Sequence, residues 1–228
     1  MLSRTDITVP LPEGDIGCYL SEQSRGRPGI ILLQEIFGVN PHIRGLADRL
    51  AEAGYCVLAP DIFHSIQPNT QLNYDDAGFT QGFQLLNQLD RDQTVADIGH
   101  CIEFLTQRGS SKVAVFGFCL GGCLAFLSAA RLSPAAAVAY YPGGIGRYTD
   151  ESAAIACPLL IHFAQSDEFV PPKHAERTRL ATQHLSDCQI ETYEAEHGFN
   201  CDERSHYDAN AAELAWQRSL AFLKHHLS

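Results

Sequence analysis

Basic residues are scarce in this sequence of 228 residues, where 16 Lys and Arg stand against 27 Asp and Glu and give a formal net charge of −11. Proteins that bind nucleic acids gain affinity by neutralising phosphates with a basic face. The 16 basic residues are also dispersed, and none lies between Arg49 and Arg91. We therefore expect no nucleic-acid partner.

Long hydrophobic runs are missing as well. No apolar run reaches the roughly 18 residues of a membrane span, and residues 1–6 lack the apolar core of a secretory signal. We expect a cytoplasmic protein with no membrane partner. With 45% hydrophobic and 19% charged residues, the composition is that of a globular chain, and the length fits one domain over residues 1–228.

No C-x-x-C spacing occurs among the eight cysteines, which argues against a zinc site. In a reducing compartment these residues would be mostly free thiols. We expect no metal and no cofactor, and at most one or two chemically special thiols. The cysteines are Cys18, Cys56, Cys101, Cys119, Cys123, Cys157, Cys188 and Cys201.

Apolar runs typical of β-strands alternate with helical stretches along the chain. Short connections between them predict an α/β fold with a mostly parallel central sheet and helices on both faces. The expected strands cover residues 29–34, 55–59, 112–116, 135–140, 158–163 and 189–193, and the expected helices cover 43–53, 94–107, 120–132, 173–185 and 209–226. Residues 6–9 and 16–20 predict an antiparallel hairpin at the sheet edge.

Four residues with nucleophilic, basic or acidic side chains follow predicted strands: Glu35, Cys119, Asp167 and His197. Open α/β sheets bind ligands outside the carboxyl ends of their strands. A thiol, an imidazole and carboxylates are the groups of nucleophilic catalysis. The strand ends therefore predict a catalytic site.

The strongest local motif is the strand-to-helix turn Gly117-Phe-Cys-Leu-Gly-Gly122. A nucleophile at such a turn has a strained backbone, and flanking glycines permit the close approach of neighbouring elements. The N–H of Leu120, at a helix N-terminus, could then stabilise an oxyanion. In the alternative interpretation, Cys119 is a small core residue and the glycines serve packing.

Chain order gives an independent argument, because this scaffold places the nucleophile first, then the acid, then the histidine. Cys119, Asp167 and His197 follow that order. Taken singly, the last two also fit a turn residue and a loop histidine, but the ordered set favours catalysis. A serine-type esterase is disfavoured, since no serine occupies the turn.

These motifs resemble those of the dienelactone hydrolase family, bacterial carboxymethylenebutenolidases with the α/β-hydrolase fold. The resemblance covers about residues 5–225. Its matching stretches are Gln34-Glu-Ile-Phe-Gly-Val-Asn40, Gly54-Tyr55 with Ala59-Pro60-Asp61, Gly117-Phe-Cys-Leu-Gly-Gly122, the loop around Asp167, and His197-Gly-Phe199.

The resemblance implies a role for each matching residue. Cys119 would be the nucleophile, His197 the general base, and Asp167 the group that orients the imidazole. Glu35 would hydrogen-bond the resting thiol and help to activate it, whereas the alternative for Glu35 is an ordinary ion-paired acid at a strand end. The backbone N–H groups of Leu120 and Ile36 would form the oxyanion hole.

The implied reaction is thiolate attack on a small ester or lactone, followed by hydrolysis of the acyl-enzyme. A thiol enzyme deacylates ordinary esters and amides poorly, so activated esters or enol lactones are expected. We expect a monomer or a small homo-oligomer. The second hypothesis, from another class, is a catalytically silent protein that binds small molecules on the same scaffold.

The substrate pocket departs from the family pattern. Two arginines that the family uses for a substrate carboxylate fall at Phe79 and Cys201. Arg204 is the nearest replacement, although it also fits a solvated loop residue. We therefore expect a more apolar pocket and a neutral substrate. The candidate pocket residues are Phe37, Phe79, Phe83, Leu86, Phe199 and Arg204.

Cys123 lies one helical turn after Cys119, which raises the question of a resolving thiol. Disulfides within one helix fit the required geometry badly. A small buried side chain is therefore the favoured interpretation.

Overall fold

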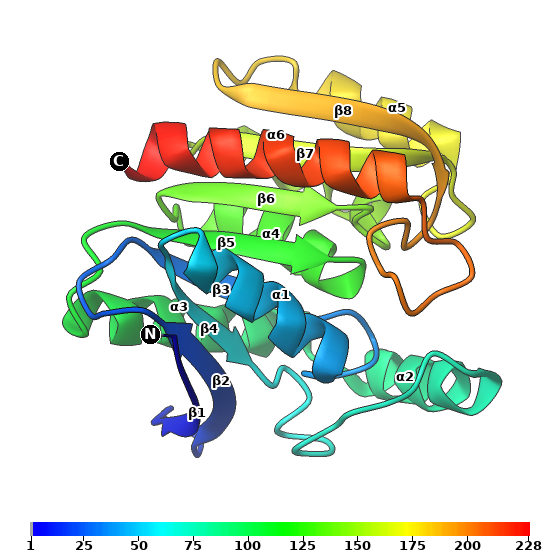
Figure 1. Cartoon of the computed structure of the whole chain (residues 1–228). Coiled ribbons are helices and arrows are strands. Elements are labelled where there is room, and N and C mark those ends of the chain that lie inside the picture. Colours follow the sequence, from blue (N-terminus) through cyan, green and yellow to red (C-terminus); the bar gives the residue numbers. More distant parts are fainter. Residues whose placement is uncertain (1) are drawn as a thin grey trace. The chain divides into compact units, whose positions relative to one another are not determined.

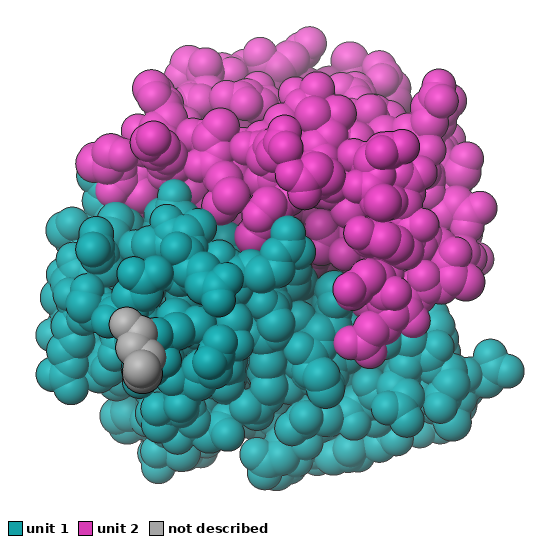
Figure 2. All heavy atoms as spheres, viewed as in Figure 1, with its two compact units in different colours: residues 1–113 teal, residues 114–228 magenta. Residues whose placement is uncertain are grey.

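The computed structural model describes residues 2–228 and divides the chain into two compact units, one ending at Val113 and one covering residues 114–228 (Figure 2). Each unit contains part of the α/β architecture and is described in turn.

The sheet of the first unit has four strands, β1 (Ser3–Val9), β2 (Ile16–Glu22), β3 (Gly29–Leu33) and β4 (Cys56–Pro60), in the order β1-β2-β4-β3. β1 pairs antiparallel with β2, and β2 with β4, while β3 and β4 are parallel. The predicted antiparallel hairpin is therefore present. β3 and β4 are buried along their whole length, as their continuous apolar sequences require.

Helices cover both faces of this sheet, with α1 (Pro41–Glu52) on one and α3 (Arg91–Gln107) on the other (Figure 1). The start of α1 is fixed by its sequence. Asn40 accepts a hydrogen bond from the N–H of Ile43 at 3.1 Å, and Pro41 occupies the first turn. Both are standard helix-start signals, because the first N–H groups of a helix lack internal acceptors.

The second unit contains four parallel strands in chain order, β5 (Val113–Phe118), β6 (Ala136–Tyr140), β7 (Leu159–Ser166) and β8 (Cys188–Glu196). α6 (Ala209–Leu227) covers one face, and α4 (Leu120–Arg131) and α5 (Pro172–Thr182) cover the other (Figure 1). Two 3₁₀ segments, η1 (Ile145–Arg147) and η2 (Thr149–Ala154), follow β6. The predicted mostly parallel α/β fold is confirmed.

One helix, α2 (Asp76–Gln88), was not predicted. Its two glycines lower helix propensity, but both occupy positions of close backbone approach. A Cβ on Gly78 would clash with the carbonyl oxygen of Asn73, and one on Gly82 would lie 2.7 Å from the carbonyl oxygen of Ile36. Packing between segments thus overrides local propensity here.

Gly117 is a glycine whose replacement is expected to lower stability strongly. A Cβ at this position would clash with the carbonyl of Gly121. We expect Gly117→Ala to lower the free energy of unfolding by about 3 kcal/mol or more, since the backbone on both sides must shift. Urea denaturation measures the change.

Gly144→Ala is the matched control, because Gly144 has φ +86° but a Cβ added there would have no heavy atom within 4 Å. Its cost should be limited to the positive φ, about 1–2 kcal/mol. Equal losses in the two variants would contradict the clash at Gly117.

Candidate active site

Three of the predicted site residues lie at the carboxyl ends of strands in the second unit. Cys119 directly follows β5, Asp167 directly follows β7, and His197 directly follows β8. Because the strands are parallel, these ends point to the same edge of the sheet.

The backbone of Cys119 is strained, with φ 51° and ψ −112°. Neighbouring segments hold it there: its N–H donates to the carbonyl of Tyr140 at 3.0 Å, and its carbonyl accepts from Gly143 at 3.0 Å and Cys123 at 3.1 Å. Positive φ is costly for a residue with a side chain and is found where function requires it. The thiol is half-buried.

Glycines allow this turn to form. A Cβ on Gly122 would lie 2.6 Å from the carbonyl oxygen of Tyr140, and one on Gly143 would lie 3.4 Å from Sγ of Cys119. Leu120 is the first residue of α4, so its N–H has no acceptor within the helix. That N–H is available to an anion at the helix N-terminus.

Asp167 and His197 form a buried pair. Oδ2 of Asp167 accepts a hydrogen bond from Nδ1 of His197 at 2.8 Å, and the two side chains are 0% and 2% exposed. Oδ1 of Asp167 accepts the N–H groups of Phe169 and Val170, each at 2.8 Å. These contacts fix the position of the carboxyl group and, through it, the orientation of the imidazole.

Nε2 of His197 is buried and has no nitrogen or oxygen partner among residues 2–228, which leaves it to the thiol of Cys119. Burial by itself lowers the pKa of His197. The negative charge of Cys119 and the hydrogen bond to Asp167 act in the opposite direction and raise that pKa to about 10. The imidazole therefore holds its proton at neutral pH.

Two aromatic residues that the sequence did not single out fix the imidazole ring. Tyr141 and Phe169 both contact it edge-on, with ring centroids at 4.9 and 4.8 Å. Tyr141 is fully buried and has φ 33°. The residue pattern could have revealed Tyr141 only through its position directly after β6.

Glu35 and Ile36 lie in the first unit, in the segment that follows β3. Both are buried. Oε2 of Glu35 accepts a hydrogen bond from the hydroxyl of Tyr74 at 3.2 Å. Tyr74 was not predicted, because it lies 39 residues away in the chain and in no recognisable motif.

Three of the candidate pocket residues cluster in the first unit. Phe37 contacts Phe79 edge-on at 4.9 Å, and Phe79 stacks with Phe83 at 6.5 Å. Tyr74 joins the cluster at 4.5 Å from Phe37. Leu86 is half-buried one helical turn beyond Phe83 on α2. Phe37, Tyr74, Phe79 and Phe83 thus form an aromatic cluster in the first unit.

The remaining candidate pocket residues lie after β8. Phe199 is fully buried and contacts Tyr141 and Tyr193, each at 5.2 Å. Arg204 is half-buried, and its guanidinium lies so close to Gly198 that a Cβ there would clash with it. Cys201 is fully buried. Arg204 therefore packs against the loop that carries His197.

Cys123 is fully buried on α4. No disulfide joins any of the eight cysteines in residues 2–228. Within the same residues, no group of three or more His, Cys, Asp or Glu side chains has the arrangement of a metal site.

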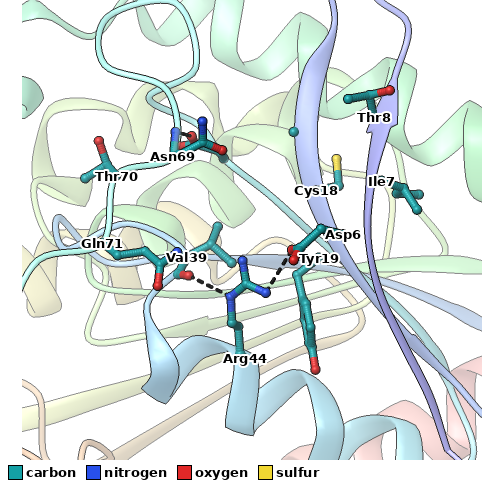
Figure 3. Close-up of a pocket in the computed structure, with 12 residues that line it drawn as sticks. Asp6, Ile7, Thr8, Cys18, Tyr19, Val39, Arg44, Asn69, Thr70 and Gln71 are labelled. Carbon is teal, nitrogen blue, oxygen red and sulfur yellow. Dashed lines mark hydrogen bonds and ion pairs between the residues drawn. The ribbon is translucent and has the colours of Figure 1, made fainter.

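A cavity of about 570 Å³ lies in the first unit, between the β1–β2 hairpin and residues 69–71 (Figure 3). Arg44 is its main cationic group. Nη1 of Arg44 pairs with Asp6 at 2.8 Å, Nε donates to the carbonyl of Val39 at 3.2 Å, and the guanidinium covers the ring of Tyr19. The charges of Arg44 and Asp6 thus offset each other, while Asp61, also in the lining, accepts the N–H groups of Phe63 and Asn69.

No helix within residues 2–228 has the length and apolar character required to cross a membrane.

Comparisons with known proteins give a consistent result. Residues 16–227 match the model of the dienelactone hydrolase family. A carboxymethylenebutenolidase of Pseudomonas putida is 34% identical over 203 residues, covering 86% of this chain and 85% of its own.

Two solved structures are similar over nearly the whole chain. A Klebsiella pneumoniae protein assigned to the dienelactone hydrolases superposes with a TM-score of 0.88 at 27% identity, covering 98% of this chain and 99% of its own. A dienelactone hydrolase-like promiscuous phosphotriesterase from metagenomic libraries gives a TM-score of 0.85 at 23% identity, covering 100% and 99%. The second likeness concerns the fold alone.

Proposed function

Because the chain belongs to the dienelactone hydrolase family and is a hydrolase acting on a small molecule, we propose that it cleaves an activated carboxylic ester or enol lactone with Cys119, His197 and Asp167. The observation that carries this proposal is the buried Asp167–His197 pair, whose free ring nitrogen is left to a thiol at a strained strand-to-helix turn. Such an arrangement serves nucleophilic catalysis.

In the acylation half of the reaction, the Cys119 thiolate attacks the substrate carbonyl carbon and forms a tetrahedral oxyanion. The N–H of Leu120 stabilises the negative oxygen. As the C–O bond breaks, the imidazolium of His197 gives its proton to the leaving oxygen, and a thioester remains on Cys119. Asp167 holds the imidazole in place throughout.

In the second half, water attacks the thioester. His197, now neutral, takes a proton from that water, the C–S bond breaks, and the thiolate returns as the carboxylic acid product leaves. Substrates with good leaving groups are favoured. A poor leaving group is a strong nucleophile once released, and it readily attacks the thioester and reverses the acylation.

Glu35 and Ile36 complete the proposed catalytic set through their match to the family motif. Glu35 would assist activation of the thiol when substrate binds, and the N–H of Ile36 would be the second oxyanion donor. Two observations support a fixed position for this carboxylate: Glu35 is buried, and its Oε2 accepts a hydrogen bond from the hydroxyl of Tyr74. The family match over residues 16–227 supports one catalytic domain.

The proposed substrate is neutral. Phe79 and Cys201 stand where the resemblance places the arginines for a substrate carboxylate. Phe79 packs against the ring of Phe37, and Cys201 is fully buried. We expect a neutral aryl ester and an unsubstituted enol lactone to be hydrolysed with kcat/KM at least about 10-fold above that for a carboxylated dienelactone, a difference of about 1.4 kcal/mol.

Initial rates with the three substrates test this prediction. Phe79→Arg is the informative variant, because it restores a cation at half-buried position 79 and should narrow the difference. A clear preference of the wild-type enzyme for the carboxylated substrate would disprove the neutral-substrate proposal and would leave the ester hydrolase proposal intact.

A further inference from the structure

A chain of hydrogen bonds runs through the interior of the second unit from a surface ion pair. Arg218 pairs with Glu191 at 3.0 Å and donates from Nη1 to the hydroxyl of Tyr193 at 3.1 Å. Tyr193 contacts Nδ1 of His162 at 2.9 Å, and Nε2 of His162 contacts the hydroxyl of Ser219 at 2.9 Å. His162 and Ser219 are 0% exposed.

The last bond of the chain joins Ser219 to the hydroxyl of Tyr140 at 2.9 Å. None of these groups takes part in the chemistry proposed above. A histidine with no exposed surface, bonded at both ring nitrogens, is costly to bury unless every polar group is satisfied. The arrangement therefore needs an explanation.

The charge state of His162 follows from its surroundings. Burial lowers the pKa of His162 to about 3, and the charge of Arg218 acts in the same direction, so the ring is neutral and carries one N–H. An arginine can only donate, so the hydroxyl of Tyr193 accepts from Arg218. A neutral imidazole offers one donor and one acceptor, and the hydroxyl groups of Tyr193 and Ser219 can match either tautomer.

This hydrogen-bond chain touches the segments that hold the nucleophile. The carbonyl of Tyr140 accepts the N–H of Cys119 at 3.0 Å. The carbonyl of His162 accepts the N–H of Tyr141 at 2.7 Å. The ring of Tyr141 in turn contacts the imidazole of His197.

The hydrogen-bond chain also contacts the segment after His197. The ring of Tyr193 lies 5.2 Å from that of Phe199, two residues beyond the imidazole. Phe199 also contacts Tyr141 at 5.2 Å. Cys119 and His197 are therefore each contacted by residues of the hydrogen-bond chain or by direct neighbours of those residues.

We propose that His162, Tyr193 and Ser219 are positioning residues that set the geometry between Cys119 and His197. The proposal rests on the proposed function for its effect on catalysis. Displacements of about 1 Å or less at reacting atoms lower rates measurably, and a rigid, fully satisfied polar network is a physical means of preventing them.

Two variants remove single hydroxyl groups from the chain: Tyr193→Phe and Ser219→Ala. Ser152→Ala is the matched control, because Ser152 is a buried serine of the same unit that donates to the carbonyl of Ala181 at 2.8 Å, outside the chain. The readouts are kcat and KM with a neutral activated aryl ester and the rate at which iodoacetamide alkylates Cys119, identified by mass spectrometry.

We expect Tyr193→Phe and Ser219→Ala each to lower kcat about 5- to 20-fold, with KM changed less than about twofold. Both should also slow the alkylation of Cys119. The control should keep kcat within about twofold. Arg218→Gln, at the half-exposed end of the chain, should lower kcat about two- to threefold without disturbing the core.

The proposal is overturned if the chain variants, measured where they are folded, lose no more kcat and no more alkylation rate than Ser152→Ala. If Tyr193→Phe and Ser219→Ala fail to fold, Arg218→Gln alone tests the proposal. Wild-type values of kcat and of the alkylation rate in Arg218→Gln would then overturn it. A wild-type protein that hydrolyses no ester would contradict the proposed function, while the alkylation rates would still test positioning.

Discussion

Replacing Cys119 with alanine is expected to lower kcat for an activated aryl ester by at least about 10⁴-fold. The reason is that no acyl-enzyme can form without the thiolate, and no serine or threonine hydroxyl lies at the turn after β5. Alanine removes only Sγ. Fold is checked by thermal denaturation, and turnover by release of the aryl alcohol.

Cys123→Ala is the matched control for this prediction. It removes the thiol of a fully buried residue in the first turn of α4, four residues after Cys119. We expect kcat to stay within about twofold of the wild-type value. Retention of activity in Cys119→Ala, or equal loss in both variants, would sink the assignment of the nucleophile.

Asp167→Asn is expected to lower kcat about 10²- to 10⁴-fold while the protein stays folded. An amide keeps the shape of the carboxylate and can still accept from Phe169 and Val170, but it brings no negative charge to Nδ1 of His197. The imidazolium loses that stabilisation. The pKa of His197, raised to about 10 in the wild-type protein, must therefore fall.

Both effects can be measured. Steady-state kinetics gives kcat, and an NMR pH titration of the His197 ring protons should show its pKa lower than in the wild-type protein. Asp150→Asn is the control, since Asp150 forms an exposed ion pair with Arg177 in the same unit. An unchanged rate in Asp167→Asn would remove Asp167 from the triad.

The candidate site residues could be proposed from the sequence because their signals are local. Cys119, Asp167 and His197 each directly follow a strand, so the ends of three strands place them at one sheet edge. Their order along the chain and the glycines around Cys119 add independent information. The alternation of strands and helices likewise predicted the fold class.

The residues that the sequence did not reveal act through packing across the chain. Tyr141 and Phe169 hold the imidazole by ring contacts, and Tyr74 reaches Glu35 over a separation of 39 residues. No local pattern encodes such contacts. The helix α2 was missed for the same reason, because its glycines are explained only by the backbone that they approach.

The distribution of the thiols has a practical consequence. Six of the eight cysteines are buried, and only Cys119 and Cys188 are partly accessible. Burial raises the pKa of Cys188, which makes that thiol a slow nucleophile. We therefore expect a fluorophore or spin label supplied in limiting amount to attach selectively at position 119. Such a label would probe the surroundings of the proposed active site without any engineered cysteine.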